Sequence, residues 1–183
     1  MPLPIEKQID RLLELGFHEA AGFNADEFKS YVPNQKNTNG LLVVSERCLN
    51  IAKQCQLLGI RNNIFLDDHE NLYPVPPTQL YWRYNVNDGR TLPNIFATGV
   101  ELLKMKRLPA NTVEILAIYR EDPDVIKFSH YIDALGSRFR DWYIPMLFMP
   151  RTLNDEPVVL QLECYIPIEY RSPCWGTASY GSD

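Results

Sequence analysis

The stretch LLVVSERCLNIAKQCQLLGIRNNIFL, residues 41–66, decides the fold class of this 183-residue chain. Its first four residues form a continuous apolar run, which is typical of a strand covered on both faces. Apolar residues then recur at helical spacing from Cys48 up to Gly59, with Ser45 as a candidate helix cap. Residues 63–66 have the composition of a second strand. Strand, helix and strand at this spacing predict one parallel βαβ unit.

Helices are predicted on the N-terminal side of this unit. Apolar residues repeat at helical spacing over residues 5–15, and Gly16 would end that helix. Asn24, with Glu27 three residues later, predicts a capping box at the start of a short helix.

Beyond residue 66, helices and strands lead into a β-rich last third. Residues 80–86 alternate as a half-exposed strand would, and residues 92–106 are helix-like. Asn111 and Glu114 predict a capped helix that ends near residue 122. Strands are predicted over 128–135, 142–149 and 158–166, followed by an irregular tail over 167–183. The whole indicates a single α+β (mixed α/β) domain, residues 1–183, in which N-terminal helices, one βαβ unit and two further helices precede a C-terminal antiparallel meander.

Composition excludes several classes of partner. Hydrophobic residues make up 45% of the chain and charged residues 22%, which is ordinary for a globular protein. The net charge of -5 argues against binding to nucleic acid or to an anionic membrane surface. No apolar stretch is long enough to span a bilayer or to act as a secretory signal, so we expect a soluble, cytoplasmic protein without membrane contact.

An acidic cluster with a histidine follows the second predicted strand. Ligands in open α/β sheets gather outside the carboxyl ends of strands, and oxygen ligands with an imidazole suit a divalent cation. Asp67, Asp68 and His69 are therefore candidate metal ligands. A solvated acidic loop explains the same residues.

A second candidate site combines a basic hairpin with the C-terminal tail. Arg138 would anchor an anionic group, because arginine pairs with carboxylates and phosphates in a bidentate manner. Cys174 and Trp175 of the tail would complete this patch, with Trp175 packing on the apolar part of the ligand. Surface charge over a core, with a tail that covers a sheet edge, is the alternative. A nucleophilic pair of Cys174 with His130 is a further hypothesis.

Several short segments resemble a bacterial family classed as a domain of unknown function. They are the LLELGF helix at residues 12–17, the segments at residues 107–109 and 112–114, ALGSR at 134–138 with the Ile-Pro pair at 144–145, and CWGTAS at 174–179. The resemblance implies one domain over the whole chain and supplies no catalytic residues.

The function expected from these patterns is the binding of a small anionic ligand by an accessory protein. A small hydrolase or transferase that uses the loop with His69 is one alternative. A protein-interaction module with aromatic surface residues is another. No pattern in the sequence names a cofactor.

Overall fold

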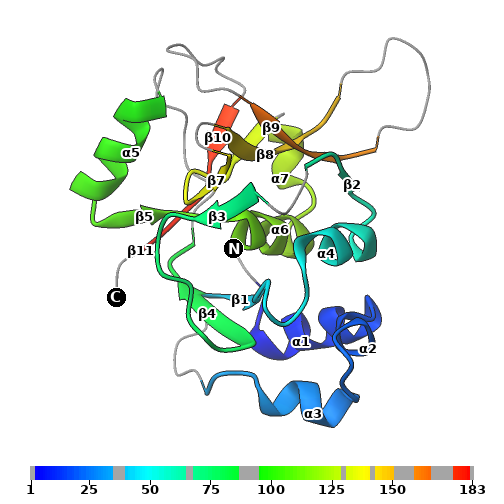
Figure 1. Cartoon of the computed structure of the whole chain (residues 1–183). Helices are drawn as coiled ribbons and strands as arrows, with labels where there is room; N and C mark the ends of the chain where they lie inside the picture. Colours follow the sequence, from blue (N-terminus) through cyan, green and yellow to red (C-terminus); the bar gives the residue numbers. More distant parts are fainter. Residues whose placement is uncertain are drawn as a thin grey trace.

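The computed structural model describes residues 3–34, 40–64, 68–86, 95–128, 131–140, 143–150, 159–165 and 175–181. Helices and short strands form an α+β fold there, which confirms the predicted class (Figure 1).

Three short helices precede the first strand: α1 (Ile5–Glu14), α2 (Phe17–Ala20) and α3 (Ala25–Ser30). The predicted cap of α3 is present, because the Asn24 side chain accepts a hydrogen bond from the backbone N–H of Glu27 at 2.9 Å. The buried side chains Leu12, Phe17 and Phe28 place these helices in one hydrophobic core with the first strand.

Strand β1 (Gly40–Val44) pairs with β4 (Leu80–Tyr84) as an antiparallel ribbon. All five residues of β1 are buried, because its alternate side chains enter two different cores. Leu41 and Val43 pack toward α6 (Thr112–Glu121), whereas Leu42 and Val44 pack toward the N-terminal helices. The predicted strand covered on both faces is thus confirmed.

The outer edge of β1 is closed by polar side chains from two helices. Gln8 of α1 donates to the carbonyl of Gly40 at 2.9 Å and accepts from the N–H of Leu42 at 2.8 Å. Arg120 of α6 donates to the carbonyl of Leu42 at 2.6 Å. Side chains therefore satisfy these three backbone groups, at an edge with which none of the described strands pairs.

Helix α6 lies at the centre of the molecule (Figure 1). It is buried on nearly all sides, since it packs against β1, β8 and α4. The predicted capping box is confirmed: Asn111 accepts from the N–H of Glu114, and the Glu114 side chain accepts from the N–H of Asn111. The other helices of the described chain are α4 (Ile51–Leu57), α5 (Ile95–Lys104) and α7 (Val125–Phe128).

A five-stranded sheet packs against α6 through β8, and its strand order is β10-β6-β8-β9-β2. Strand β8 is antiparallel to both β6 and β9, as expected of the predicted meander, whereas the outer strands β10 and β2 are parallel to β6 and β9. The strands are β2 (Arg61–Asn62), β6 (Tyr131–Asp133), β8 (Ile144–Phe148), β9 (Gln161–Tyr165) and β10 (Trp175–Thr177).

Two small antiparallel ribbons complete the fold. Strand β3 (His69–Asn71) pairs with β7 (Ser137–Phe139), and β5 (Arg107–Pro109) pairs with β11 (Ser179–Gly181).

Three local expectations are corrected. The βαβ unit over residues 41–66 is wrong, because β1 pairs with β4 whereas β2 pairs with β9 of another sheet. Asn50, not Ser45, caps α4, because its side chain accepts from the N–H of Lys53. Residues 80–86 were expected to have one exposed face, but Tyr81, which lies on that face, is buried in the core around α6.

The irregular tail expected over residues 167–183 also needs correction in its described part. Residues 175–177 form β10, parallel to β6, and residues 179–181 form β11. Backbone pairing with distant strands orders this segment, although its own sequence has no strand pattern.

Within the described ranges, no helix is both long and apolar enough to cross a membrane.

Candidate functional site

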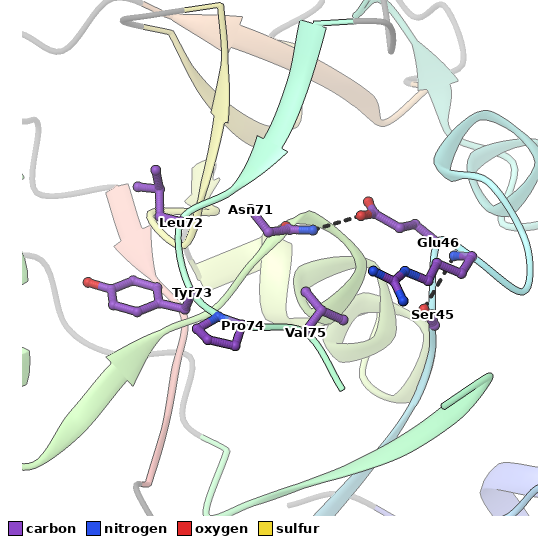
Figure 2. Close-up of a pocket in the computed structure, with 8 residues that line it drawn as sticks. Ser45, Glu46, Asn71, Leu72, Tyr73, Pro74 and Val75 are labelled. Carbon is purple, nitrogen blue, oxygen red and sulfur yellow. Dashed lines mark hydrogen bonds between the residues drawn. The ribbon is translucent and has the colours of Figure 1, made fainter. Parts of the chain in front are cut away.

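A cavity of about 470 Å³ opens at the carboxyl end of β1. Two segments line it, residues 45–47 after β1 and residues 71–75, which begin at the last residue of β3 (Figure 2). Its volume lies within the range of small-molecule sites. We call it the Glu46 cavity.

The turn after β1 sets the position of the Glu46 side chain. The Ser45 hydroxyl accepts the backbone N–H of Arg47 at 3.3 Å, and the Ser45 carbonyl accepts the N–H groups of Cys48 and Leu49 at 3.0 Å each. The Glu46 carboxyl group then faces Asn71 across the cavity wall (Figure 2), where the Asn71 amide donates to it at 2.8 Å.

Glu46 belongs to a closed ring of five polar residues from four parts of the fold. The Asn71 oxygen accepts from the Ser137 hydroxyl at 2.9 Å, and that hydroxyl accepts the N–H of Thr112 at 3.0 Å. The Thr112 hydroxyl lies 2.8 Å from His69 Nε2, and His69 Nδ1 lies 3.6 Å from Glu46 Oε2. We call this set the polar ring. It joins β3, β7 and the start of α6 to the cavity wall.

Burial controls the charge of the two titratable groups in the polar ring. The His69 side chain is 4% exposed, and its burial lowers its pKa from 6.5 to about 4. His69 is therefore neutral at pH 7. Burial also raises the pKa of Glu46, partly offset by the positive charge of Arg47 and the hydrogen bond from Asn71.

These features define what the cavity can bind. Arg47 supplies a positive charge on the cavity lining. The Glu46 carboxyl group can accept a hydrogen bond when it is ionised and can donate one when it is protonated. Its raised pKa favours the protonated form. The Asn71 amide and the Ser45 hydroxyl lie on the same lining.

Of the three predicted metal ligands, the two that the structure describes have side chains with different partners. Asp68 is exposed and forms an ion pair with Arg140 at 3.0 Å, whereas His69 turns inward to Thr112. Asp67 lies outside the described residues. No group of three or more His, Cys, Asp or Glu side chains suited to a metal is found in the described part of the chain. The metal site stays a prediction.

The predicted anion patch is described only in part. Arg138 is exposed on β7, opposite Glu70 of β3. The backbone of Trp175 lies in β10, beside Tyr131 of β6. Cys174 lies outside the described residues, as does His130, its partner in the nucleophile hypothesis.

The described cysteines are free thiols. Burial raises the pKa of both Cys55 and Cys164 to about 12, with Glu163 adding to the effect at Cys164. These two thiols therefore lack the lowered pKa that a reactive cysteine needs.

Sequence reasoning selected His69 but missed its neighbours. Glu46 and Arg47 belong to no recognisable binding motif, since residues 45–47 contain no glycine and so form no glycine-rich phosphate loop. The available signal was their place directly after a buried strand, where ligands commonly bind. Thr112 and Ser137 gave no local signal, because each is joined to the polar ring by tertiary contacts.

No family model, no curated protein and no solved structure matches the chain.

Proposed function

We propose that this protein binds a small molecule with an anionic group in the Glu46 cavity. The observation that carries the proposal is the pairing of a cation with an oriented, partly buried carboxyl group on one lining. Arg47 would attract the anion, and Glu46, held by Asn71 and backed by His69, would bind a polar group of the same ligand.

The raised pKa of Glu46 favours this pairing. A fully ionised carboxylate would repel an anionic ligand, whereas a protonated carboxyl group can donate a hydrogen bond to it. Arg138, from the patch predicted with Cys174 and Trp175, is the competing anchor for the anion. It lies on β7, and the cavity lining does not include it.

The test is a titration with inorganic phosphate and with succinate, followed by amide NMR shifts. We expect shifts at residues 45–47 and 71–73, and an affinity at least about tenfold lower in Arg47→Gln, since a hydrogen bond to a charged group contributes about 1.5–3 kcal/mol. Arg138→Gln is the matched control and should bind as the wild type does. Loss of affinity in Arg138→Gln alone would move the site to the patch on β7. No response to either anion would contradict the function.

Acid–base catalysis is a second candidate, favoured by the contact between Glu46 and His69. Glu46 both lines the cavity and faces a neutral imidazole, as a general base that activates water would. Thr112 is fully buried, so its hydroxyl is not offered to a substrate in the cavity. Hydrolysis of small esters by the wild type, abolished in Glu46→Gln, would support this candidate. Equal rates in the two proteins would reject it.

A further inference from the structure

A second cavity, of about 370 Å³, lies at the opposite end of the β3–β7 ribbon. It is lined by the last residue of β7 and the residue after it, the residue just before β8, strand β9 and the segment after β2. We call it the Arg140 cavity. None of its lining residues lines the Glu46 cavity.

Aromatic and aliphatic side chains form one wall of the Arg140 cavity. The rings of Phe139 and Tyr143 meet edge to face, with centroids 6.4 Å apart and planes at 73°. Phe139 and Ile64 are 7% and 6% exposed, so both are fixed by the core. Such a wall suits a flat apolar ring, because aromatic groups pack well edge to face and offset.

Arg140 is held at this cavity by a defined set of contacts. Its backbone has a positive φ of 49°, a conformation that costs energy for a residue other than glycine. Asp68 holds it through two interactions, from the backbone N–H to the Asp68 carbonyl at 2.9 Å and from Nε to the carboxylate at 3.0 Å. The guanidinium also lies 5.4 Å from the centre of the Phe139 ring. A planar cation is thus placed beside an aromatic wall.

The remaining lining supplies an acceptor. Asn63 donates to Glu163 and to Gln161 at 2.8 Å each. The Glu163 carboxylate accepts hydrogen bonds and has none to donate when it is ionised. A ligand that contacts Glu163 therefore needs a hydroxyl or amino group.

We propose that the Arg140 cavity binds a monocyclic aromatic carboxylate that also carries a ring hydroxyl or amino group. The carboxylate pairs with Arg140, the ring packs against Phe139 and Tyr143, and the hydroxyl or amino group donates to Glu163. The volume is at the lower end of small-molecule sites, which fits a single ring. This site is independent of the function proposed for the Glu46 cavity.

Calorimetric titration with 4-hydroxybenzoate tests the site. We expect the wild type to bind 4-hydroxybenzoate at least about tenfold more tightly than the neutral 4-hydroxybenzamide, because only the carboxylate pairs with arginine. Arg140→Gln should lose that preference. The side chain of Arg140 is 60% exposed, so this variant should keep the fold, which circular dichroism checks.

Two matched variants separate this proposal from the others. Arg138→Gln, on the same ribbon, and Arg47→Gln, in the Glu46 cavity, should both keep wild-type affinity for 4-hydroxybenzoate. The proposal is overturned if the wild type does not bind this probe at millimolar concentration, or if the amide binds as tightly. It is also overturned if Arg47→Gln abolishes binding while Arg140→Gln does not, which would place the probe in the Glu46 cavity.

Discussion

Burial moves the two titratable side chains of the polar ring toward their neutral forms. His69 loses affinity for its proton and Glu46 gains affinity for one, because a charge is less stable away from water. The 3.6 Å between His69 Nδ1 and Glu46 Oε2 is too long for a hydrogen bond, so the pair does not offset this cost as a close ion pair would. Stability and ligand binding should therefore depend on pH through these two residues.

Acidification should destabilise the protein through His69. A pKa lowered from 6.5 to about 4 means that the unfolded state takes up the proton first as the pH falls. The contribution of His69 to stability is complete above pH 6.5 and is lost between pH 6.5 and 4, by up to about 3 kcal/mol. Urea unfolding at pH 7.5 and pH 4.5 measures this loss, and His69→Gln should show less of it. The same pH dependence in both proteins would contradict the prediction.

Binding of an anion in the Glu46 cavity should weaken as the pH rises through the pKa of Glu46. That pKa is raised, so the protonated carboxyl group persists to higher pH than in an ordinary glutamate, and its ionisation introduces repulsion. Titration with sulfate, whose own charge stays constant across this pH range, checks the effect. Glu46→Gln keeps an oxygen for the Asn71 amide and should bind without this pH dependence. A dependence that survives in the variant would assign it to another group.

At the scale of elements, helix α6 is the part on which the rest of the fold depends. Its capping residue Glu114 is 3% exposed and accepts from Arg83 at 2.6 Å as well as from the N–H of Asn111. The Arg83 guanidinium lies 4.2 Å from the centre of the Tyr180 ring in β11. One carboxylate thereby joins the start of α6 to β4 and indirectly to the last strand.

Glu114→Ala should lower the free energy of unfolding by about 3 kcal/mol, because it leaves the half-buried Arg83 and the Asn111 N–H without their acceptor. Chemical unfolding at pH 7 measures the change. Asn24→Ala removes the exposed cap of the short helix α3 and should cost about 1 kcal/mol. Equal losses in the two variants would show that Glu114 acts as a helix cap alone.

Gly40→Ala should destabilise the β1–β4 ribbon by at least about 2 kcal/mol, because an added Cβ would lie 1.8 Å from the Trp82 indole nitrogen. Unfolding measurements on this variant, on Trp82→Leu and on the double variant form a mutant cycle. We expect the double variant to be more stable than the sum of the single losses implies, since the smaller side chain removes the clash. Additive losses would refute close packing between these positions.

At the scale of the whole molecule, the C-terminal strands close two separate sheets. Strand β10 pairs with β6 in the five-stranded sheet, and β11 pairs with β5. Between them, Ala178 is fully buried and its carbonyl accepts the N–H of Ala110 at 2.9 Å. The segment is therefore part of the core.

Deletion of residues 175–183 should abolish cooperative unfolding or lower the melting temperature by more than about 10 °C, because it removes two strand pairings and buried apolar surface. Thermal unfolding followed by circular dichroism measures this. Deletion of residues 182–183 alone is the control and should leave the transition in place. A cooperative transition at the wild-type temperature in the longer deletion would contradict a core role for these strands.

The sequence by itself determined the features that depend on near neighbours. The caps at Asn24 and Asn111 follow from side chains that reach a backbone N–H three residues away. The continuous apolar run of β1 follows from burial on both faces, and the helical periods from the burial of one face each. These features establish the α+β class. His69 was selected because its place after a predicted strand is a local signal.

Tertiary structure alone decided the strand partners and the two cavities. Strand β1 pairs with β4 and not with β2, and the last two strands pair with β6 and β5. Any extended segment can form backbone hydrogen bonds with another, so no local sequence pattern specifies which strand will be its partner. The polar ring likewise joins Glu46 and His69 to Thr112 and Ser137, which lie far from them in the sequence. Contacts between residues so distant in sequence form only when the chain packs, so composition and periodicity do not predict them.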